Sequence, residues 1–554
     1  MLLFRTLPRF SVVSLLSGLF LSSATLTPSL IPRDMLFQGL LAGVAMASGY
    51  LIMRFVLALW SALAVPMLTG VPARIAKITL AIPVFSLLVF CAGEARDWQD
   101  SIRLRMDLPV LEATSTLKVI AVALVVFLAL FLIGVLIQQL FDLLRNRLSR
   151  YIPERNANVL GLLLSALVVI VVTRDGVVNN AMQILDKSYV AAQHLTKPQL
   201  AAPTAGWQSG SVQSEISWDL MGEPGREFVL GGPKKIDIET FNQRSAKQPL
   251  RIYVGLAQDS DPMVRARFAL EEMIRTGAFQ RKILIVASPT GTGWMDPASY
   301  DALEYMHDGD IATVAAQYSY LQSPLALIFE TESGLEQATA LMQVVYKYWI
   351  ELPKEHRPRL YMHGMSLGAW SSMFAFNIFQ MINEPIDGAL WVGPPFSSTL
   401  WNQANSARRS SSPYVLPEID QGQVIRYSSQ FGEPDRSGEP WGRMRVLFLQ
   451  YASDPIVFYS PSTLWQEPIW MREAAAPDVS PALFFTPIVT QLQLAVDMAL
   501  STLPPAGFGH TYSTKDYIDA WVAVTAPQDW NEDMSERLKK HCGQDPQIGC
   551  GGRP

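Results

Sequence analysis

Five long apolar runs precede residue 175, and they constrain this chain more than any other feature. A helix needs about 20 mostly apolar residues to cross a bilayer. The runs cover residues 10–28, 36–53, 75–91, 117–140 and 159–172. Because several runs of this length would overfill the core of one soluble domain, we predict a transmembrane helical domain of about five spans over residues 1–175. The last run is short and the second continues beyond Arg54, so counts of four and six stay open.

The arginines and lysines between the runs predict the orientation, since cytoplasmic loops retain positive charge. With five spans and an inner N-terminus, the cytoplasmic side holds Arg5, Arg9, Arg74, Lys77, Arg145, Arg147, Arg150 and Arg155. The opposite side holds Arg33, Arg96, Arg103, Arg105 and Arg174, several of them interleaved with acidic residues. We therefore expect an inner-membrane protein whose C-terminal domain faces the periplasm or exterior. A cleaved signal peptide ending near Ala24 is the rival interpretation, and it leaves that domain outside as well.

The remaining sequence is typical of a water-soluble domain. Charged residues make up only 17% of the 554-residue chain, against about 25% in an ordinary soluble protein, and the deficit lies before residue 175. A net charge of −5 without a basic block argues against nucleic acid as a partner. Cys542 and Cys550 flank a short tail and favour a small disulfide loop, with free thiols or a metal as alternatives.

Short β-branched runs alternate with helical stretches from residue 251 onward. The apolar runs are RIYVGLA, KILIVAS, IATVAAQY, RLYMHG, GALWVG and RVLFLQY. This alternation is the signature of a doubly wound, mostly parallel sheet, in which ligand chemistry sits at the carboxyl ends of the strands. We assign residues 251–554 to one such doubly wound α/β domain. Residues 176–250, rich in Gly and Pro, form a linker with a small subdomain.

A G-x-S-x-G motif runs from Gly364 to Gly368, where a predicted strand meets a predicted helix. Chance alone would produce the motif roughly 0.2 times in a chain of this length. Its strand-to-helix setting is that of a nucleophile elbow, which presents serine on a strained turn. We therefore predict that Ser366 is a nucleophile, with a helix-capping serine as the alternative.

A serine nucleophile needs a base. In the α/β-hydrolase fold, which carries such elbows, the catalytic residues follow one another in the chain as serine, acid and histidine. His510, a Gly-flanked loop residue after the last strands, is the best of six histidines. The others are His194, His307, His356, His363 and His541. Asp454 follows the strand RVLFLQY directly and precedes a proline, which makes it the predicted acid. Its substitutes are Asp420, Asp435 and Asp478.

The developing oxyanion needs backbone N–H donors. Leu367, next to the nucleophile, should supply one, and Thr290 or Gly291 in the turn SPTGTGW should supply the other. No metal site or cofactor is expected.

Longer motifs resemble a multi-span bacterial family, alpha/beta-hydrolase family nine. They are TLTPSLIPR, RTGAFQRK, SPTGTGWMDP, ALEYMHDGDIATVAAQYSYLQSP, LPKEHRPRLYMHGMSLGAW and GALWVGPPF. The resemblance covers nearly the whole chain, and it implies a membrane domain fused to a G-x-S-x-G hydrolase with its nucleophile at Ser366. The His-Gly signature found in the oxyanion loop of many soluble relatives is absent here, and Thr290-Gly291 takes its place.

We therefore expect an esterase or lipase that cleaves an amphiphilic ester, such as a lipid, at the membrane. The insert at residues 397–444, rich in aromatic residues, is a candidate lid, with a plain surface excursion as the alternative. An acyltransferase acting on a lipid or glycan alcohol, and an inactive scaffold or transporter, are the competing functions. The sequence indicates no oligomeric state.

Overall fold

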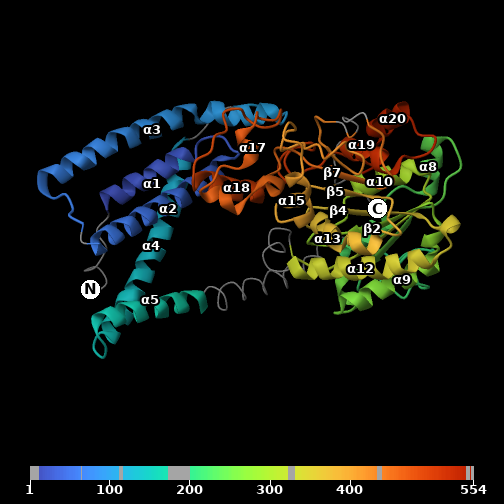
Figure 1. Cartoon of the computed structure of the whole chain (residues 1–554), viewed down its shortest axis with the longest axis horizontal. Coiled ribbons are helices and arrows are strands. Elements are labelled where there is room, and N and C mark those ends of the chain that lie inside the picture. The colour runs from blue at the N-terminus through green and yellow to red at the C-terminus, as the bar shows by residue number, and fades with distance from the viewer. Residues whose placement is uncertain are drawn as a thin grey trace. The chain divides into compact units, whose positions relative to one another are not determined.

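The chain folds into two compact units in a computed structural model (Figure 1), which describes residues 11–63, 65–111, 116–171, 200–321, 331–432, 434, 439–543 and 549–550. The first unit comprises Met1–Lys187 together with Pro461–Met471 and Val479–Asp497. The second comprises Ser188–Ser460, Arg472–Asp478 and Met498–Pro554. The sequence had assigned all of residues 251–554 to one domain, whereas two stretches of that range belong to the first unit.

Each of the five predicted apolar segments coincides over most of its length with a helix of the first unit. The helices are α1 (Val12–Ala24), α2 (Met35–Ala62), α3 (Gly70–Arg105), α4 (Thr116–Leu148) and α5 (Glu154–Val171). Three of them, α2, α3 and α4, are long and apolar enough to cross a membrane. With 13 residues, α1 reaches only about 20 Å, short of a hydrocarbon core of about 30 Å. Length and composition thus single out three of the five predicted spans.

Small residues bring the helices of the first unit into close contact. A Cβ atom on Gly39 would lie 2.7 Å from Cβ of Val122, and one on Gly43 would lie 2.7 Å from the Ala123 carbonyl oxygen. The rising residue numbers on both helices show that α2 and α4 run parallel. Such glycine spacing is typical of helices that pack in lipid, where close backbone approach replaces the hydrophobic effect.

The first unit also contains most of the helix α18 (Val489–Leu500), up to Asp497. The Asp497 carboxylate is fully buried and accepts hydrogen bonds from Ser29 Oγ at 3.0 Å and the Leu30 backbone N–H at 2.9 Å. The side-chain amide of Gln493 donates to the Thr27 carbonyl oxygen at 3.0 Å. The loop at residues 25–33, between α1 and α2, is therefore bound to a segment more than 400 positions later in the chain.

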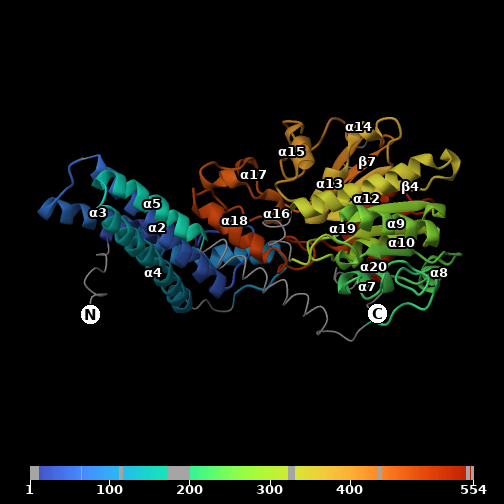
Figure 2. The same cartoon turned by 90° about the horizontal axis from the view of Figure 1, so that it is seen from below.

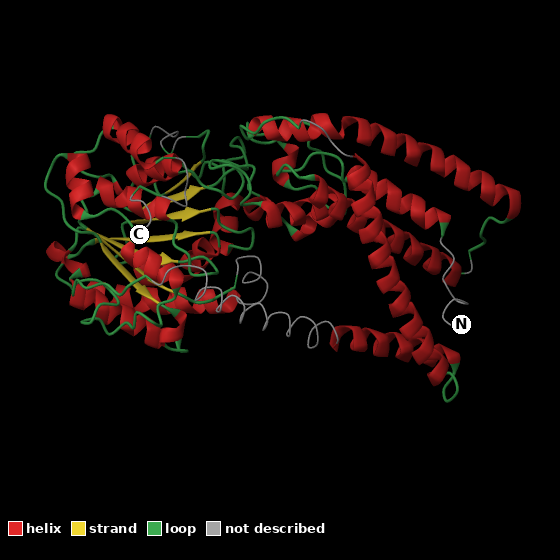
Figure 3. Cartoon of the chain, turned by 180° about the vertical axis from the view of Figure 1, so that it is seen from behind, coloured by secondary structure: helices red, strands yellow, loops and turns green. Residues whose placement is uncertain are grey.

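A seven-stranded parallel sheet forms the centre of the second unit (Figure 3). Its strand order is β1-β3-β2-β4-β5-β7-β6, and every neighbouring pair is parallel. The strands are β1 (Leu250–Val254), β2 (Ile283–Ser288), β3 (Ile311–Ala316), β4 (Arg359–Met365), β5 (Gly388–Val392), β6 (Ile425–Ser428) and β7 (Arg445–Leu449). Six of the seven coincide with the predicted apolar runs, and the predicted doubly wound α/β-hydrolase fold is confirmed.

Helices cover both faces of this sheet (Figures 1 and 2). One layer holds α9 (Pro262–Thr276), α12 (Thr331–Glu351) and α13 (Leu367–Ala375), and the other holds α10 (Pro297–Met306), α19 (Thr514–Thr525) and α20 (Glu532–Cys542). Because both faces are covered, the strands are buried apolar runs with no polar alternation. The nucleophile strand β4 lies at the centre of the sheet.

Shorter elements complete the second unit. They are α7 (Glu223–Leu230), α8 (Lys235–Asn242), α14 (Ile378–Met381), α15 (Thr399–Ser406), α16 (Pro455–Phe458) and the 3-10 turns η2 (Leu256–Gln258), η3 (Ala278–Gln280) and η4 (Lys354–His356). Outside this unit lies η5 (Pro461–Leu464), and α17 (Ile469–Arg472) follows it. Cys542 and Cys550 form the disulfide that their spacing had favoured.

The insert at residues 397–444 does not lie wholly outside the sheet. It contains α15 and the edge strand β6, which pairs with β7 from Ile425 to Ser428. This strand was not predicted from the sequence, from which the whole insert was a candidate lid. A lid role for the remainder of the insert stays a prediction.

Candidate active site

Ser366 occupies a strained turn between β4 and α13. Its φ and ψ are 56° and −126°, in a region that side chains other than glycine rarely adopt and that costs about 1–3 kcal/mol. Its side chain makes no capping hydrogen bond to α13, so it does not act as a helix cap. Its backbone N–H instead donates to the Val392 carbonyl oxygen at 2.8 Å, which fixes the turn against the end of β5.

The two motif glycines let the backbone pass close to Ser366. A Cβ atom on Gly364 would lie 2.3 Å from the carbonyl carbon of Gly368, and one on Gly368 would lie 2.2 Å from the Ser288 carbonyl oxygen. Both neighbours are backbone atoms that cannot rotate away. Glycine is thus required at both positions for the elbow to form, and the second contact places the end of β2 against the elbow.

Asp454 and His510 form a buried hydrogen-bonded pair. Asp454 begins α16, where one carboxylate oxygen, Oδ1, accepts from the Ile456 backbone N–H at 2.9 Å. The other oxygen, Oδ2, lies 2.6 Å from Nδ1 of His510. The second ring nitrogen of His510, Nε2, is buried and has no hydrogen-bond partner in the part of the chain that the structure describes. This nitrogen is therefore available to accept a proton from another group.

Ser366 and His510 approach consecutive residues at the end of β5. Val392 accepts the hydrogen bond from the Ser366 backbone, and a Cβ atom on the next residue, Gly393, would lie 2.7 Å from Cε1 of His510. The carboxyl ends of β4, β5 and β7 thus bring together the serine, the histidine and the aspartate that were predicted from sequence. The Ser366 hydroxyl is not hydrogen-bonded to Nε2 here, and such contacts are often long before substrate binds.

Of the histidines that the structure describes, His510 alone contacts a carboxylate through its ring. His363 in β4 has its ring buried between Ser299 Oγ, 2.9 Å from Nε2, and the Leu390 carbonyl oxygen, 2.7 Å from Nδ1. Burial lowers the pKa of His363 to about 4, so its ring is neutral at pH 7 and is a buried, hydrogen-bonded part of the core. Burial likewise lowers the pKa of His307 to about 3.

The remaining histidines are also accounted for. Nε2 of His541 lies 3.1 Å from the Tyr305 hydroxyl, in the tail and away from the elbow. His356 is exposed in η4, and His194 lies outside the described residues. Among the substitute acids, Asp478 accepts hydrogen bonds from the Ser453 backbone N–H and Gln430, whereas Asp435 lies outside the described residues. Asp420 occupies a turn with a φ of 48°.

The turn after β2 distinguishes between the two backbone N–H groups that were predicted as its oxyanion donors. The backbone N–H of Thr290 donates to the Trp294 carbonyl oxygen at 3.1 Å, so it would have to break this bond to bind an oxyanion. The backbone N–H of Gly291 has no partner in the described part of the chain. Leu367 begins α13, where the first backbone N–H groups of a helix are left without acceptors. Gly291 and Leu367 are thus the donors that fit the role.

Two family models cover most of the chain. One, described as the alpha/beta-hydrolase family, matches residues 250–538, and one described as the N-terminus of that family matches residues 26–233. The chain belongs to alpha/beta-hydrolase family nine. No curated protein matches it. The solved structure "Trichoderma reesei cutinase in complex with a C11Y4 phosphonate inhibitor" is 11% identical over 43% of this chain and 88% of the cutinase, with a TM-score of 0.18. A likeness this weak says nothing about the chemistry of this chain.

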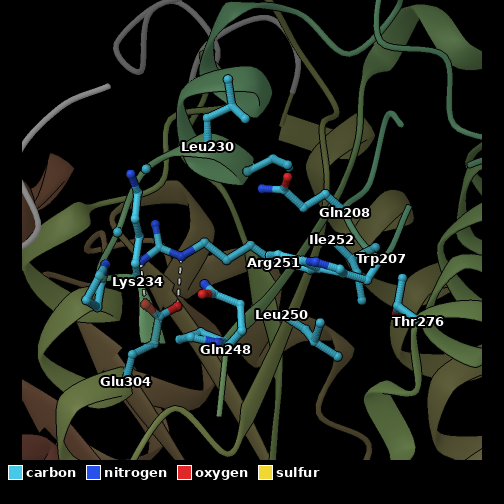
Figure 4. Close-up of a pocket in the computed structure, with 15 residues that line it drawn as sticks. Trp207, Gln208, Leu230, Lys234, Gln248, Leu250, Arg251, Ile252, Thr276 and Glu304 are labelled. Carbon is cyan, nitrogen blue, oxygen red and sulfur yellow. Dashed lines mark hydrogen bonds and ion pairs between the residues drawn. The ribbon is translucent and has the colours of Figure 1, made fainter. Parts of the chain in front are cut away.

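A separate cavity of about 220 Å³ lies at the amino-terminal end of β1 in this family-nine protein (Figure 4). It is at the wrong edge of the sheet for the elbow chemistry, which sits at the carboxyl ends. Arg251, which lines it, already pairs with Glu304 at 2.7 Å and Asp301 at 2.6 Å. No charge on this arginine is left for a ligand. Among the described residues, no cluster of His, Cys, Asp or Glu could hold a metal ion.

Two residues of the site were not predicted from the sequence. The Tyr512 hydroxyl donates to Oδ2 of Asp454 at 2.8 Å, and Ser453 Oγ accepts from the Gly509 backbone N–H at 3.0 Å and holds the histidine loop. Ser453 directly precedes Asp454 in the sequence, and Tyr512 follows His510 by two positions. Their only signal was that proximity, because a tyrosine two positions after a histidine has no meaning until the fold is known.

Proposed function

We propose that this family-nine protein is a membrane-anchored serine hydrolase that cleaves an acyl ester through Ser366, His510 and Asp454. The observation that carries the proposal is the 2.6 Å contact between His510 and Asp454, at the sheet edge where Ser366 occupies its strained turn. A nucleophile, a base and an orienting acid are the three parts that serine hydrolysis requires.

The proposed reaction has two halves. Ser366 Oγ attacks the ester carbonyl carbon while its proton passes to Nε2 of His510. The tetrahedral intermediate then collapses, the ester C–O bond breaks, and the leaving alcohol takes the proton from His510. Water repeats these steps on the acyl-enzyme and releases the carboxylic acid. Asp454 accepts the Nδ1–H of His510 throughout, which keeps the lone pair on Nε2 in the neutral ring.

The backbone N–H groups of Leu367 and Gly291 are the proposed oxyanion donors. Donors that are already aimed at the oxyanion cost nothing to reorganise, and removal of a single one from a serine protease costs about 10²–10³ in rate. The contact of Gly368 with the Ser288 carbonyl oxygen supports this pairing, because it holds the turn after β2 beside the start of α13.

The contacts inside the first unit help to assign the side of the membrane on which the catalytic domain lies. If α2, α3 and α4 each cross once, α4 ends on the side opposite to the loop at residues 25–33. Asp497, which follows nearly all of the hydrolase sequence, binds that same loop. The chain must then return across the bilayer after α4. We propose α5 for this crossing: it has 18 residues and about 27 Å of length, although it is not one of the three helices that length and composition single out.

The charges beside these helices support the extracytoplasmic side. Arg145 and Arg147 at the end of α4 and Arg150 in the turn before α5 give this end of the two helices a positive charge. The positive-inside rule places this end in the cytoplasm. Arg96, on the other side, pairs with Asp100. The disulfide between Cys542 and Cys550 agrees, because such bonds persist in oxidising compartments. A periplasmically active reporter fused after Pro554 should therefore be active and a cytoplasmic reporter inactive; the reverse result would overturn this topology.

The proposed membrane anchor suggests the class of substrate. A hydrolase that is held at a bilayer meets amphiphilic esters such as lipids at high local concentration. We therefore propose that the purified full chain in detergent hydrolyses acyl esters presented in mixed micelles, and that Ser366→Ala abolishes this turnover. Product analysis with added lipid or glycan alcohols separates hydrolysis from transfer: mainly free acid supports the hydrolase, whereas mainly transferred acyl groups would make the protein an acyltransferase.

A further inference from the structure

The Asp454 carboxylate has a second side-chain donor besides His510. Oδ2 accepts from Nδ1 of His510 at 2.6 Å and from the Tyr512 hydroxyl at 2.8 Å, while Oδ1 accepts from the Ile456 backbone N–H at 2.9 Å. Three donors therefore converge on one carboxylate, and two of them share a single oxygen atom.

The surroundings fix the Tyr512 hydroxyl in this position. Asp454 and Tyr512 both have 0% exposure, so neither group can exchange its partner for bulk water. The Tyr512 ring stacks on the Tyr451 ring, with centroids 4.3 Å apart, and a Cβ atom on Gly393 would lie 3.0 Å from the Tyr512 hydroxyl oxygen. Burial and then the nearby Asp454 carboxylate hold the pKa of Tyr512 well above its ordinary value, so the hydroxyl stays a donor.

A buried carboxylate needs such donors to remain ionised. Removal from water disfavours the charged form, whereas hydrogen bonds to the charged form favour it. Hydrogen bonds to a charged group are stronger than those between neutral groups. The Tyr512 hydroxyl thus stabilises the carboxylate that accepts the Nδ1–H of His510 and orients its ring.

We propose that Tyr512 is a positioning residue of the active site, whose hydroxyl donates to the Asp454 carboxylate, compensates its negative charge and holds it toward His510. This inference rests on the proposed function of Ser366, His510 and Asp454. Tyr512 acts only through Asp454, since its hydroxyl bonds that carboxylate. Loss of the hydroxyl should make the Asp454–His510 pair hold a proton more tightly, because the negative charge is then less compensated. The pair should therefore become an active base only at higher pH.

The test is the rate at which a fluorophosphonate probe labels the full chain in detergent, measured from pH 5 to 9. In Tyr512→Phe the acidic limb of the pH–rate profile should move upward by about 0.5–1 pH unit, which corresponds to labelling that is about threefold to tenfold slower below the limb. The probe concentration at half-maximal rate should not change, because Tyr512 is not proposed to touch the probe.

Tyr451→Phe is the matched control. Tyr451 is equally buried and stacked, but its hydroxyl donates to Asp516 and accepts from the Ser513 backbone N–H at 3.0 Å. This variant removes a buried hydroxyl next to the site and leaves every side-chain contact of Asp454 in place. Its thermal stability should fall, whereas its pH–rate profile should match the wild type.

The outcomes separate the two proposals. If wild-type protein is labelled at Ser366 but Tyr512→Phe keeps the wild-type profile, or if Tyr451→Phe shifts the limb equally, the inference about Tyr512 is wrong and the hydrolase proposal stands. If the wild type is not labelled at Ser366, both fail. Where Tyr512→Phe does not fold, 3-fluorotyrosine at position 512 keeps the ring and makes a stronger donor, so the limb should move to lower pH; an unchanged limb would refute the inference.

Discussion

Nδ1 of His510 lies 2.6 Å from Oδ2 of Asp454, although 56 positions separate the two residues in the chain. Between them, residues 461–471 and 479–497 belong to the unit of N-terminal helices. The chain thus leaves the hydrolase unit after the acid, returns to it briefly at residues 472–478, and returns again at residue 498, before the base. The acid–base pair forms because this second return places Gly509 and His510 against Ser453 and Asp454.

The three proposed catalytic residues should act as a unit, so the rate losses of single replacements should not add. His510→Ala should lose nearly as much kcat as Ser366→Ala, on the order of 10⁴-fold or more, and the double variant should be scarcely slower. Asp454→Asn should cost less than either, because the ring is still held although in the wrong tautomer. Ester turnover by the purified variants measures this. Losses that simply multiply would contradict the assignment, and activity retained in His510→Ala but lost in His541→Ala would move the base to the tail.

The elbow should not tolerate a methyl group at Gly368. In a helix Gly→Ala normally stabilises by about 1 kcal/mol, but here the new Cβ would lie 2.2 Å from the Ser288 carbonyl oxygen. Overpacking of this kind costs about 1–3 kcal/mol and should displace the turn after β2. We expect Gly368→Ala to lower the unfolding temperature and to slow probe labelling at least about tenfold. Gly93→Ala, in a helix position with open space around the Cβ, is the control and should do neither.

Buried His363 should make the hydrolase unit less stable in acid. Its pKa is about 4 in the folded protein because burial disfavours the charged ring, against about 6.5 in the unfolded chain. As the pH falls below about 6.5, the unfolded chain takes up a proton that the folded chain refuses. The free energy of unfolding therefore decreases until about pH 4, by on the order of 3 kcal/mol in total.

Thermal unfolding followed by tryptophan fluorescence at pH 7 and pH 4.5 tests this pH dependence. The drop in midpoint between the two pH values should be smaller in His363→Gln than in the wild type, although the variant is less stable at pH 7. His356→Gln changes an exposed histidine and should leave the drop unchanged. An equal drop in all three proteins would show that His363 titrates normally.

Asp497 should stabilise the first unit. Asp497→Ala would leave Ser29 Oγ and the Leu30 backbone N–H without their acceptor, at a cost of about 1–3 kcal/mol for each buried donor. We expect a lower unfolding temperature in detergent and faster proteolysis within residues 461–497. Asp142→Ala removes a half-exposed ion pair with Arg145 and an exposed 3.4 Å hydrogen bond from Gln138; such a surface ion pair is worth less than about 1 kcal/mol. If Asp142→Ala is as destabilising as Asp497→Ala, the contacts at residues 29–30 are not the reason.

The local parts of this fold could be predicted, and the distant pairings could not. Six strands were recognisable because each is a buried apolar run between turn residues. The strand β6 has only four residues, includes Arg426, and forms solely through its pairing with β7. The attachment of residues 461–497 to the loop at residues 25–33 was equally hidden, since it depends on one buried aspartate and a partner more than 400 positions away.

The candidate site divides in the same way. Ser366, Asp454 and His510 were predictable because each stands beside a strand end or a glycine-rich loop in a fixed chain order. Thr290 was an equally good oxyanion donor on paper, and only the backbone contact with Trp294 distinguishes it from Gly291. Tyr512 carries no motif at all, and its contact with Asp454 results from how the histidine loop folds back on α16.

The most direct test of the central proposal is to map the adduct of a fluorophosphonate probe on the full chain. Purified protein in detergent is labelled, digested and analysed by tandem mass spectrometry, with Ser366→Ala treated in parallel. We predict a single phosphonyl group on Ser366, and no labelling of a Ser366→Ala protein that unfolds at the wild-type temperature. Labelling of a different residue, or undiminished labelling of folded Ser366→Ala, would contradict the assignment of Ser366 as the nucleophile.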